Sequence, residues 1–487
     1  MLFSSVSFIY YFLPAFLALY FLAGRFVASV KGRNAILLLA SLFFYFAGEP
    51  VYILILLFSS AVDYFHGRYI GSHMGTVGAR AALVSSIIIN VGLLSFFKYS
   101  DFFIQNVNGL FNGDIKPLGL ALPLGISFYT FQTMSYTIDV YRGRVPSQKS
   151  FLDFAAYVTM FPQLVAGPIV RYQTVAEELE RRSSSMEKFA YGAGRFIIGL
   201  SKKALIANSL GQLSQSAAGG AASGEPSVLL YWMGTVSFML QIYFDFSGYS
   251  DMAIGLGKIM GFSFPENFRY PFTARSVTDF WRRWHITLGS WFRDYVYIPL
   301  GGSRVPAFRW AFNVLFVWFL TGFWHGAGWN FILWGLYFAV FLCLEKFVLH
   351  YFLGKWAVTD RIYTLFVLVF SFAIFDSVDL SLIPQRIGGM LGMGCSFTGN
   401  GAALLPLFNQ YALYYLKSYG VLLLVSMAAA TPLGAALYAR LSAKACGSLG
   451  IKRALCVGEP ILLGALLLLC TAYIVDSSFN PFLYVRF

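Results

Sequence analysis

Charged residues are scarce in this chain of 487 residues. They make up 12% of it, whereas a soluble globular domain carries about 25%. Hydrophobic residues make up 58%, and the mean hydropathy is +0.66. This balance excludes an ordinary soluble domain and predicts an all-α, polytopic helical membrane protein. Because most of the few charges fall in loops, the net charge of +13 indicates lipid contact and no nucleic-acid partner.

Cysteine and histidine are equally rare, with five of each. The cysteines have no paired or metal-type spacing, which predicts neither a disulfide framework nor a metal site. No phosphate-binding P-loop and no G-x-S-x-G pattern is present, so nothing indicates an ATPase or a covalent serine enzyme. The first residues have no positive n-region and no small-residue cleavage site, so we expect a retained first helix.

Apolar runs of spanning length recur along the chain. They lie near 6–24, 35–58 (interrupted at 48–50), 81–97, 226–244, 307–324, 329–350, 361–376, 417–438 and 459–475. Runs at 119–138, 151–168 and 189–210 are interrupted by Pro or Gly, which is tolerated where the backbone is buried in protein or lines a cavity. We expect about ten to thirteen helices, a small-residue loop at 212–227, and a long connection at 377–415.

Residues 1–487 are expected to form one integral membrane domain with a catalytic core at about 120–350. Basic residues gather near 31–33, 142–149, 181–188, 202–203 and 269–309, and the positive-inside tendency assigns these segments to the cytoplasmic side.

The window 279–330 holds two of the five histidines. Wound as a helix, residues 281–295 place Trp281, Trp284, His285, Leu288, Phe292 and Tyr295 on one side, as in an interfacial amphipathic helix. His325 ends a run of mostly apolar residues, where an ionisable side chain is costly and therefore a functional candidate. Glycines at 322, 326 and 328 are expected to let a substrate approach the backbone.

Each of these features also has a plain structural interpretation. His325 alone is equally compatible with a satisfied core histidine, and His285 with an interfacial residue. Arg282, Arg283 and Arg293 suit a solvated or headgroup-facing surface, with Asp279 and Asp294 as their partners. In YFDFSGYSDMAIGLGKIMGF, at 243–262, Asp245 and Asp251 either pair within the helices, polarise the histidines, or line an acceptor channel.

Two motifs give the window a family resemblance. WRRWHITLGSWFRDYVYIPLGG followed by GFWHGAGWN resembles the membrane-bound O-acyltransferases, and more narrowly the bacterial alginate O-acetyltransferase branch. The likeness extends to LPLGISFYTFQTMSYTIDVYRG at 122–143 and to FPQLVAGPIVRY at 161–172. Gln163 stands where many relatives have histidine, so no histidine role carries over to that position.

The resemblance implies a ring of tilted helices around a funnel, in a bacterial cytoplasmic (inner) membrane. His325 would be the catalytic base and His285 the second active-site residue. Acetyl-CoA would be the acyl donor, with no permanently bound cofactor, and some of Arg282, Arg283 and Arg293 would meet its phosphates. An extracytoplasmic acetyltransferase partner would complete transfer to an exopolysaccharide, alginate or a similar polymer.

Other activities stay open at this point. A related enzyme could modify cellulose, peptidoglycan, a lipid, or teichoic acid with D-alanine. A polysaccharide export channel without chemistry would also use broken helices, although such a channel has no need of the histidine in Trp324-His325-Gly326.

Overall fold

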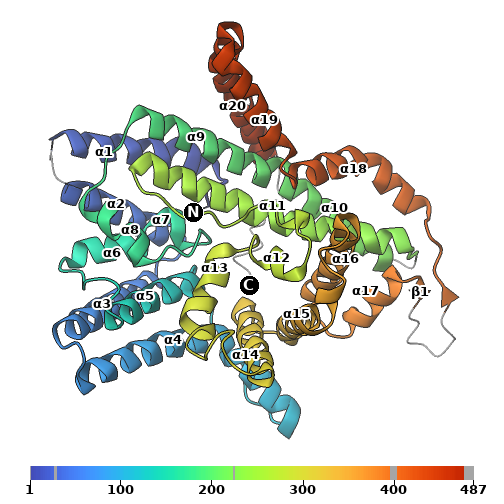
Figure 1. The fold of residues 1–487 in the computed structure, drawn as a ribbon, viewed down its shortest axis with the longest axis horizontal. Helices are drawn as coiled ribbons and strands as arrows, with labels where there is room; N and C mark the ends of the chain where they lie inside the picture. The colour runs from blue at the N-terminus through green and yellow to red at the C-terminus, as the bar shows by residue number, and fades with distance from the viewer. Residues whose placement is uncertain (1, 27–29, 223–224, 395–402, 477–487) are drawn as a thin grey trace. The chain divides into compact units, whose positions relative to one another are not determined.

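The computed structural model is almost entirely helical, as the composition predicts (Figure 1). It describes residues 2–26, 30–222, 225–394 and 403–476. These residues form two compact units: 2–196 with 249–266, and 197–248 with 267–476. Two long helices, α9 (Met186–Ser201) and α11 (Val228–Met260), contribute to both units.

The first unit is built from short and long helices that follow one another along the chain. They are η1 (Ser7–Phe12), α1 (Leu13–Phe26), α2 (Val30–Phe46), α3 (Ile53–Ser72), α4 (Val77–Phe111), α5 (Ile126–Tyr141), α6 (Phe151–Thr159), α7 (Phe161–Leu164) and α8 (Tyr172–Glu180).

The second unit carries both candidate histidines. Its elements are η2 (Lys202–Ala207), α10 (Asn208–Ala222), η3 (Pro271–Thr273), α12 (Val277–Trp281), α13 (Ile286–Phe292), η4 (Arg293–Tyr297), α14 (Ala307–His325), α15 (Trp329–Phe347), η5 (Leu349–Tyr351), α16 (Ala357–Phe375), α17 (Leu382–Met390), β1 (Met393–Gly394), β2 (Ala403–Leu404), α18 (Gln410–Ala429), α19 (Leu433–Gly447) and α20 (Leu449–Asp476). The two short strands pair antiparallel.

Seven helical stretches within the described residues are long and apolar enough to cross a membrane. They are Ser7–Gly24, Val77–Phe111, Ala307–His325, Trp329–Phe347, Ala357–Phe375, Gln410–Ala429 and Leu449–Asp476. A helix satisfies its own backbone hydrogen bonds, which is the requirement for crossing lipid. The prediction of a multi-pass, all-α membrane protein is confirmed, whereas the single domain over 1–487 stays a prediction.

Three local predictions meet different outcomes. The interruption at 48–50 is confirmed, because α2 ends at Phe46 and α3 begins at Ile53. The predicted span 417–438 is wrong: α18 ends at Ala429 and α19 begins at Leu433, since Pro432 has no N–H and disfavours a helical residue before it. The predicted loop at 212–227 is helical up to Ala222, and Leu213 and Ala217 are buried in that helix.

The connection predicted at 377–415 contains structure of its own. Helix α17 and the strands β1 and β2 lie within it, and its residues 395–402 lie outside the described residues.

Helices α14, α15 and α16 lie side by side in the second unit (Figure 1). Two glycines bring α14 and α15 together. A Cβ atom on Gly322 would lie 2.3 Å from the carbonyl oxygen of Phe331, and one on Gly335 would lie 2.3 Å from that of Trp318. Small residues at a helix crossing allow this close backbone approach in membranes. The crossing therefore fixes the position of His325, at the end of α14.

We expect Gly322→Ala to destabilise the protein by about 1–3 kcal/mol, because the added methyl group overlaps backbone that cannot rotate away. Thermal unfolding of the purified protein in detergent measures the change. Gly464→Ala is the matched control, since a Cβ atom on that helical glycine meets nothing within 4 Å. Equal melting temperatures for the two variants would show that the crossing tolerates a methyl group.

Candidate active site

His285 occupies a turn between two helices, not the middle of one. Helix α12 ends at Trp281 and α13 begins at Ile286, and His285 adopts a left-handed conformation with φ 45° and ψ 51°. The predicted continuous helix over 281–295 is therefore wrong. The left-handed region is sparsely populated for non-glycine residues and persists only where surrounding contacts impose it.

The contact that imposes it is Asn267. The backbone N–H of Ile286 donates to the Asn267 carbonyl oxygen at 3.0 Å. The N–H and the hydroxyl of Thr287 donate to Asn267 Oδ1 at 3.3 and 2.9 Å. In a continuous helix the N–H groups of Ile286 and Thr287 would donate to the carbonyl oxygens of residues 282 and 283. The predicted helix is therefore interrupted, because the buried Asn267, which lies 18 residues before His285, accepts these hydrogen bonds.

Asn267 also sets the tautomer of His285. Nδ1 of His285 lies 3.3 Å from Asn267 Oδ1. Because Oδ1 already accepts from both Thr287 donors, it is an acceptor here, and Nδ1 must carry the proton. This leaves the lone pair of the neutral imidazole on Nε2. Asn267 was missed by sequence reasoning, and its only signal was an isolated amide in the aromatic stretch FSFPENFRYP.

The His285 ring is enclosed by aromatic side chains. It is 1% exposed, and it packs edge-on against Phe246 at 4.7 Å and against Trp324 at 6.0 Å between ring centroids. Burial lowers the pKa of His285 well below its usual value, and the nearby His325 lowers it further. His285 is therefore neutral at physiological pH.

His325 is the last residue of α14 and is also buried, at 4% exposure. Its ring packs edge-on against Trp334 at 4.9 Å and Phe375 at 5.7 Å, and against Trp324 at 5.0 Å. Trp324 thus contacts both histidines. The structure brings the two candidates together, from α14 and from the turn before α13.

The glycines around His325 do not offer open backbone to a substrate, contrary to the sequence-based expectation. A Cβ atom on Gly326 would lie 2.2 Å from the Phe331 ring, and one on Gly328 would lie 2.6 Å from Asn330 Oδ1. The space at these two glycines, and at Gly322 in the helix crossing, is filled by side chains and backbone of the protein itself. Packing therefore requires glycine at these positions.

The three arginines separate into two groups. Arg283 is held by Asp279, with Nε donating to Oδ1 at 2.8 Å. Arg282 and Arg293 are exposed and line one cavity of about 500 Å³, which we call the arginine cavity. Arg293 also pairs with Asp294 at 2.7 Å. The predicted partnership with Asp279 and Asp294 is confirmed for Arg283 and Arg293.

The arginine cavity approaches both histidines along the chain. Its lining includes Ile286, the residue after His285, and Thr321, one helical turn before His325 on α14. The remaining wall is largely apolar, with Trp281 and Trp318 among its members. A ligand there would meet cationic groups at one part and an apolar wall near the histidines at another.

Glu345 is a second functional position that sequence reasoning missed. Its carboxylate, on α15, accepts from the N–H of Val277 at 2.5 Å and from the N–H and hydroxyl of Thr278 at 2.9 and 2.7 Å. It thereby fixes the start of α12, whose end leads to His285. An acidic residue inside the apolar run 329–350 was the signal that could have identified it.

Asp245 and Asp251 pair within the helices, which was one of the interpretations left open. Asp245 lies 2.7 Å from Lys203 Nζ, and both side chains are buried. Asp251 lies 2.6 Å from Arg195 Nη2.

The lowered pKa of His285 predicts a pH-dependent stability. Below about pH 6.5 the unfolded chain protonates this histidine while the folded protein does not. The unfolded state then binds more protons, so stability falls as pH falls, by up to about 1.4 kcal/mol per pH unit. His285→Gln should lose less melting temperature than the unchanged protein between about pH 7.5 and 5.5. Parallel melting curves would contradict a neutral, buried His285.

Comparison with known proteins agrees with the motifs. Residues 142–375, which include both histidines, match the model of the membrane-bound O-acyltransferase family. The chain is 41% identical over 351 residues to the probable alginate O-acetylase AlgI of Pseudomonas aeruginosa, covering 71% of this chain and 66% of that protein. It is 38% identical over 408 residues to the protein of the same name from Pseudomonas syringae pv. tomato, covering 81% and 76%.

A relative with a different name is nearly as similar. The peptidoglycan O-acetyltransferase of Helicobacter pylori is 37% identical over 377 residues, covering 72% of this chain and 71% of that protein. The paired buried histidines, the spanning helices and these matches agree with one another: the chain belongs to the membrane-bound O-acyltransferase family and is a multi-pass membrane acyltransferase.

Proposed function

We propose that this enzyme passes acetyl groups from cytoplasmic acetyl-CoA across the membrane for O-acetylation of an exopolysaccharide, alginate or a similar polymer. The observation that carries the proposal is the pair of buried imidazoles, His285 and His325, which both contact Trp324. The similarity to probable alginate O-acetylases supports the choice of acceptor.

In the proposed reaction His325 is the general base. It takes the proton of an acceptor hydroxyl as the oxygen attacks the thioester carbonyl carbon. A new C–O bond forms, the C–S bond breaks, and the imidazolium returns the proton to the leaving sulfur. The aromatic rings around His325 keep water from the thioester, which water would otherwise hydrolyse.

His285 is proposed as the second active-site residue. Asn267 holds His285 with its proton on Nδ1. The lone pair on Nε2 can then accept a hydrogen bond from either substrate, the acyl donor or the acyl acceptor. Its neutrality matters, because a second positive charge beside His325 would oppose formation of the imidazolium.

Coenzyme A is proposed to enter through the arginine cavity. Arg282 and Arg293 would meet its phosphates, since guanidinium groups suit phosphate geometry. Arg283 has its guanidinium on Asp279 and does not line this cavity. We therefore narrow the three predicted phosphate contacts to two. No cofactor is proposed to stay bound.

The proposed location is the bacterial inner membrane, with an extracytoplasmic acetyltransferase partner completing transfer to the polymer. The basic segment 269–309 would be cytoplasmic by the positive-inside tendency.

Peptidoglycan is the second candidate acceptor, because the Helicobacter pylori relative carries that name. Cellulose, teichoic acid and lipid acceptors stay as alternatives within the family. A non-enzymatic export channel is the alternative of a different class, and it gives no reason for two buried, adjacent histidines.

Replacing the proposed base tests the function directly. His325→Ala should abolish acetyl ester on the secreted polysaccharide while the polymer is still secreted, and His285→Ala should reduce it strongly. Acetyl ester content is measured at matched membrane abundance, with His350→Ala, an exposed histidine after α15, as the control. Unchanged acetylation in His325→Ala would remove it as the base, and loss of the polymer itself would favour the export channel.

The donor site makes a separate prediction. Arg282→Gln and Arg293→Gln should each raise the KM for acetyl-CoA about tenfold, the equivalent of one lost charge-assisted hydrogen bond, with kcat little changed. Kinetics of the purified enzyme measure this. Arg275→Gln, an exposed arginine outside the cavity lining, is the control. The donor assignment would be wrong if all three variants had the same KM.

A further inference from the structure

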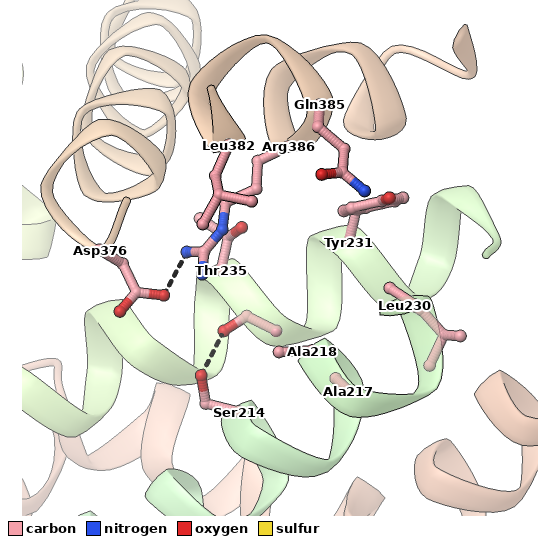
Figure 2. A pocket seen from close by; sticks show the side chains of 12 residues that line it. Ser214, Ala217, Ala218, Leu230, Tyr231, Thr235, Asp376, Leu382, Gln385 and Arg386 are labelled. Atoms are coloured by element: carbon pink, nitrogen blue, oxygen red, sulfur yellow. Dashed lines mark hydrogen bonds and ion pairs between the residues drawn. The ribbon is translucent and has the colours of Figure 1, made fainter. Parts of the chain in front are cut away.

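A second cavity in the same unit is not used by the chemistry described so far. It measures about 200 Å³ and lies between α10, α11, the end of α16, and α17 (Figure 2). We call it the Asp376 cavity. Its polar lining residues are Ser214, Thr235, Asp376, Gln385 and Arg386, and the Tyr231 ring adds an aromatic surface.

The lining of this cavity includes one acidic and one basic side chain, so the charges cancel. Arg386 Nη1 pairs with Asp376 Oδ2, and Figure 2 shows the pair at one wall of the cavity. The pair uses one atom of each group, which leaves further N–H donors on the guanidinium and an oxygen on the carboxylate. A ligand with many hydroxyl groups suits such paired donors and acceptors.

Gln385 also favours a hydroxyl-rich ligand. Its side chain lines the cavity beside Tyr231 (Figure 2). Among the described residues no hydrogen bond to the Gln385 amide is found, although the amide has two donors and an acceptor. The Tyr231 ring itself is closely held, because a Cβ atom on Gly389 would lie 2.3 Å from it. A fixed aromatic face with amide, guanidinium and carboxylate groups around it is the chemistry that recognises a sugar ring.

The Asp376 cavity is connected to the proposed base through one aromatic residue. Asp376 directly follows Phe375, whose ring packs on His325. Asn330 Nδ2 donates to the Phe375 carbonyl oxygen at 2.9 Å, which ties the end of α16 to the start of α15. Asp376 on the cavity wall is therefore the residue next to one that contacts His325.

We infer that the Asp376 cavity binds a hydroxyl-rich sugar residue of the acceptor polysaccharide. The inference rests on the proposed function for its acceptor, and it names a site for that acceptor apart from the arginine cavity. The site holds the polymer by its hydroxyl groups and by the face of one sugar ring.

A brace between α16 and α17 is the competing explanation of the Asp376–Arg386 pair. Gln385 separates the two explanations, because no hydrogen bond to its amide is found within the described part of the chain and a purely structural brace does not need it. A variant at Gln385 should therefore alter sugar binding without altering stability.

The test measures binding of two probes, cellotetraose and a mannuronate tetrasaccharide, to the purified full chain in lipid nanodiscs. Ligand-observed NMR titration gives the Kd. We expect saturable binding of at least one probe, weakened about fivefold by Gln385→Ala, as for one lost hydrogen bond, and at least as much by Arg386→Gln. Gln215→Ala, an exposed residue on α10 outside the cavity lining, should bind as the unchanged protein does.

The two probes distinguish a neutral sugar from a uronic acid as the favoured ring. Absence of saturable binding of both, or equal Kd values for Gln385→Ala and the unchanged protein, would overturn the sugar site. His325→Ala should keep the Kd while losing acetyl transfer. If that variant still transferred acetyl while Gln385→Ala weakened binding, the proposed base would fail and the sugar site would stand.

Discussion

The arrangement of this site depends on the amide and carbonyl of one buried residue, Asn267. A helix start leaves several N–H groups without helical partners, and in an apolar environment each unpaired group is costly. Asn267 accepts from Ile286 and Thr287 and thereby supplies those partners. The chain can then turn at 282–285 instead of continuing as a helix, and the turn points the His285 ring inward. A straight helix would have left His285 on a surface stripe.

A second buried polar group fixes another helix start near the site, and aromatic rings enclose His325. Glu345 holds the start of α12 through three hydrogen bonds, as Asn267 holds the start of α13. Trp324, Trp334 and Phe375 surround His325 with rings that leave little room for water. Burial also disfavours the charged imidazole of His285 and lowers its pKa. The role proposed for His285 needs a neutral ring, so the burial that stabilises the fold also suits that role.

The sequence alone identified candidate site residues but not their geometry. The apolar runs identified most of the spanning helices because lipid permits few backbone solutions, and His285 and His325 stood out as ionisable residues among aromatic ones. The helix predicted over 281–295 failed because its periodic pattern is local, whereas the competing acceptor Asn267 is distant in sequence. The prediction that the glycines after α14 admit a substrate failed for a related reason. A glycine in a sequence indicates that space is needed, but not whether a ligand or Phe331 fills that space. Glu345 could have been found, since an acid within an apolar run requires a partner.

Two separate cavities lie in the unit that carries both candidate histidines. The arginine cavity is lined by Ile286, the residue after His285, and by Thr321, whereas the Asp376 cavity is lined by Asp376, the residue after Phe375. Acyl transfer needs donor and acceptor to meet at one base, yet a single open channel would admit water to the thioester. In the proposed function, separate cavities would let the acyl donor and the sugar bind in their own spaces. The rings around His325 would then keep water from the thioester.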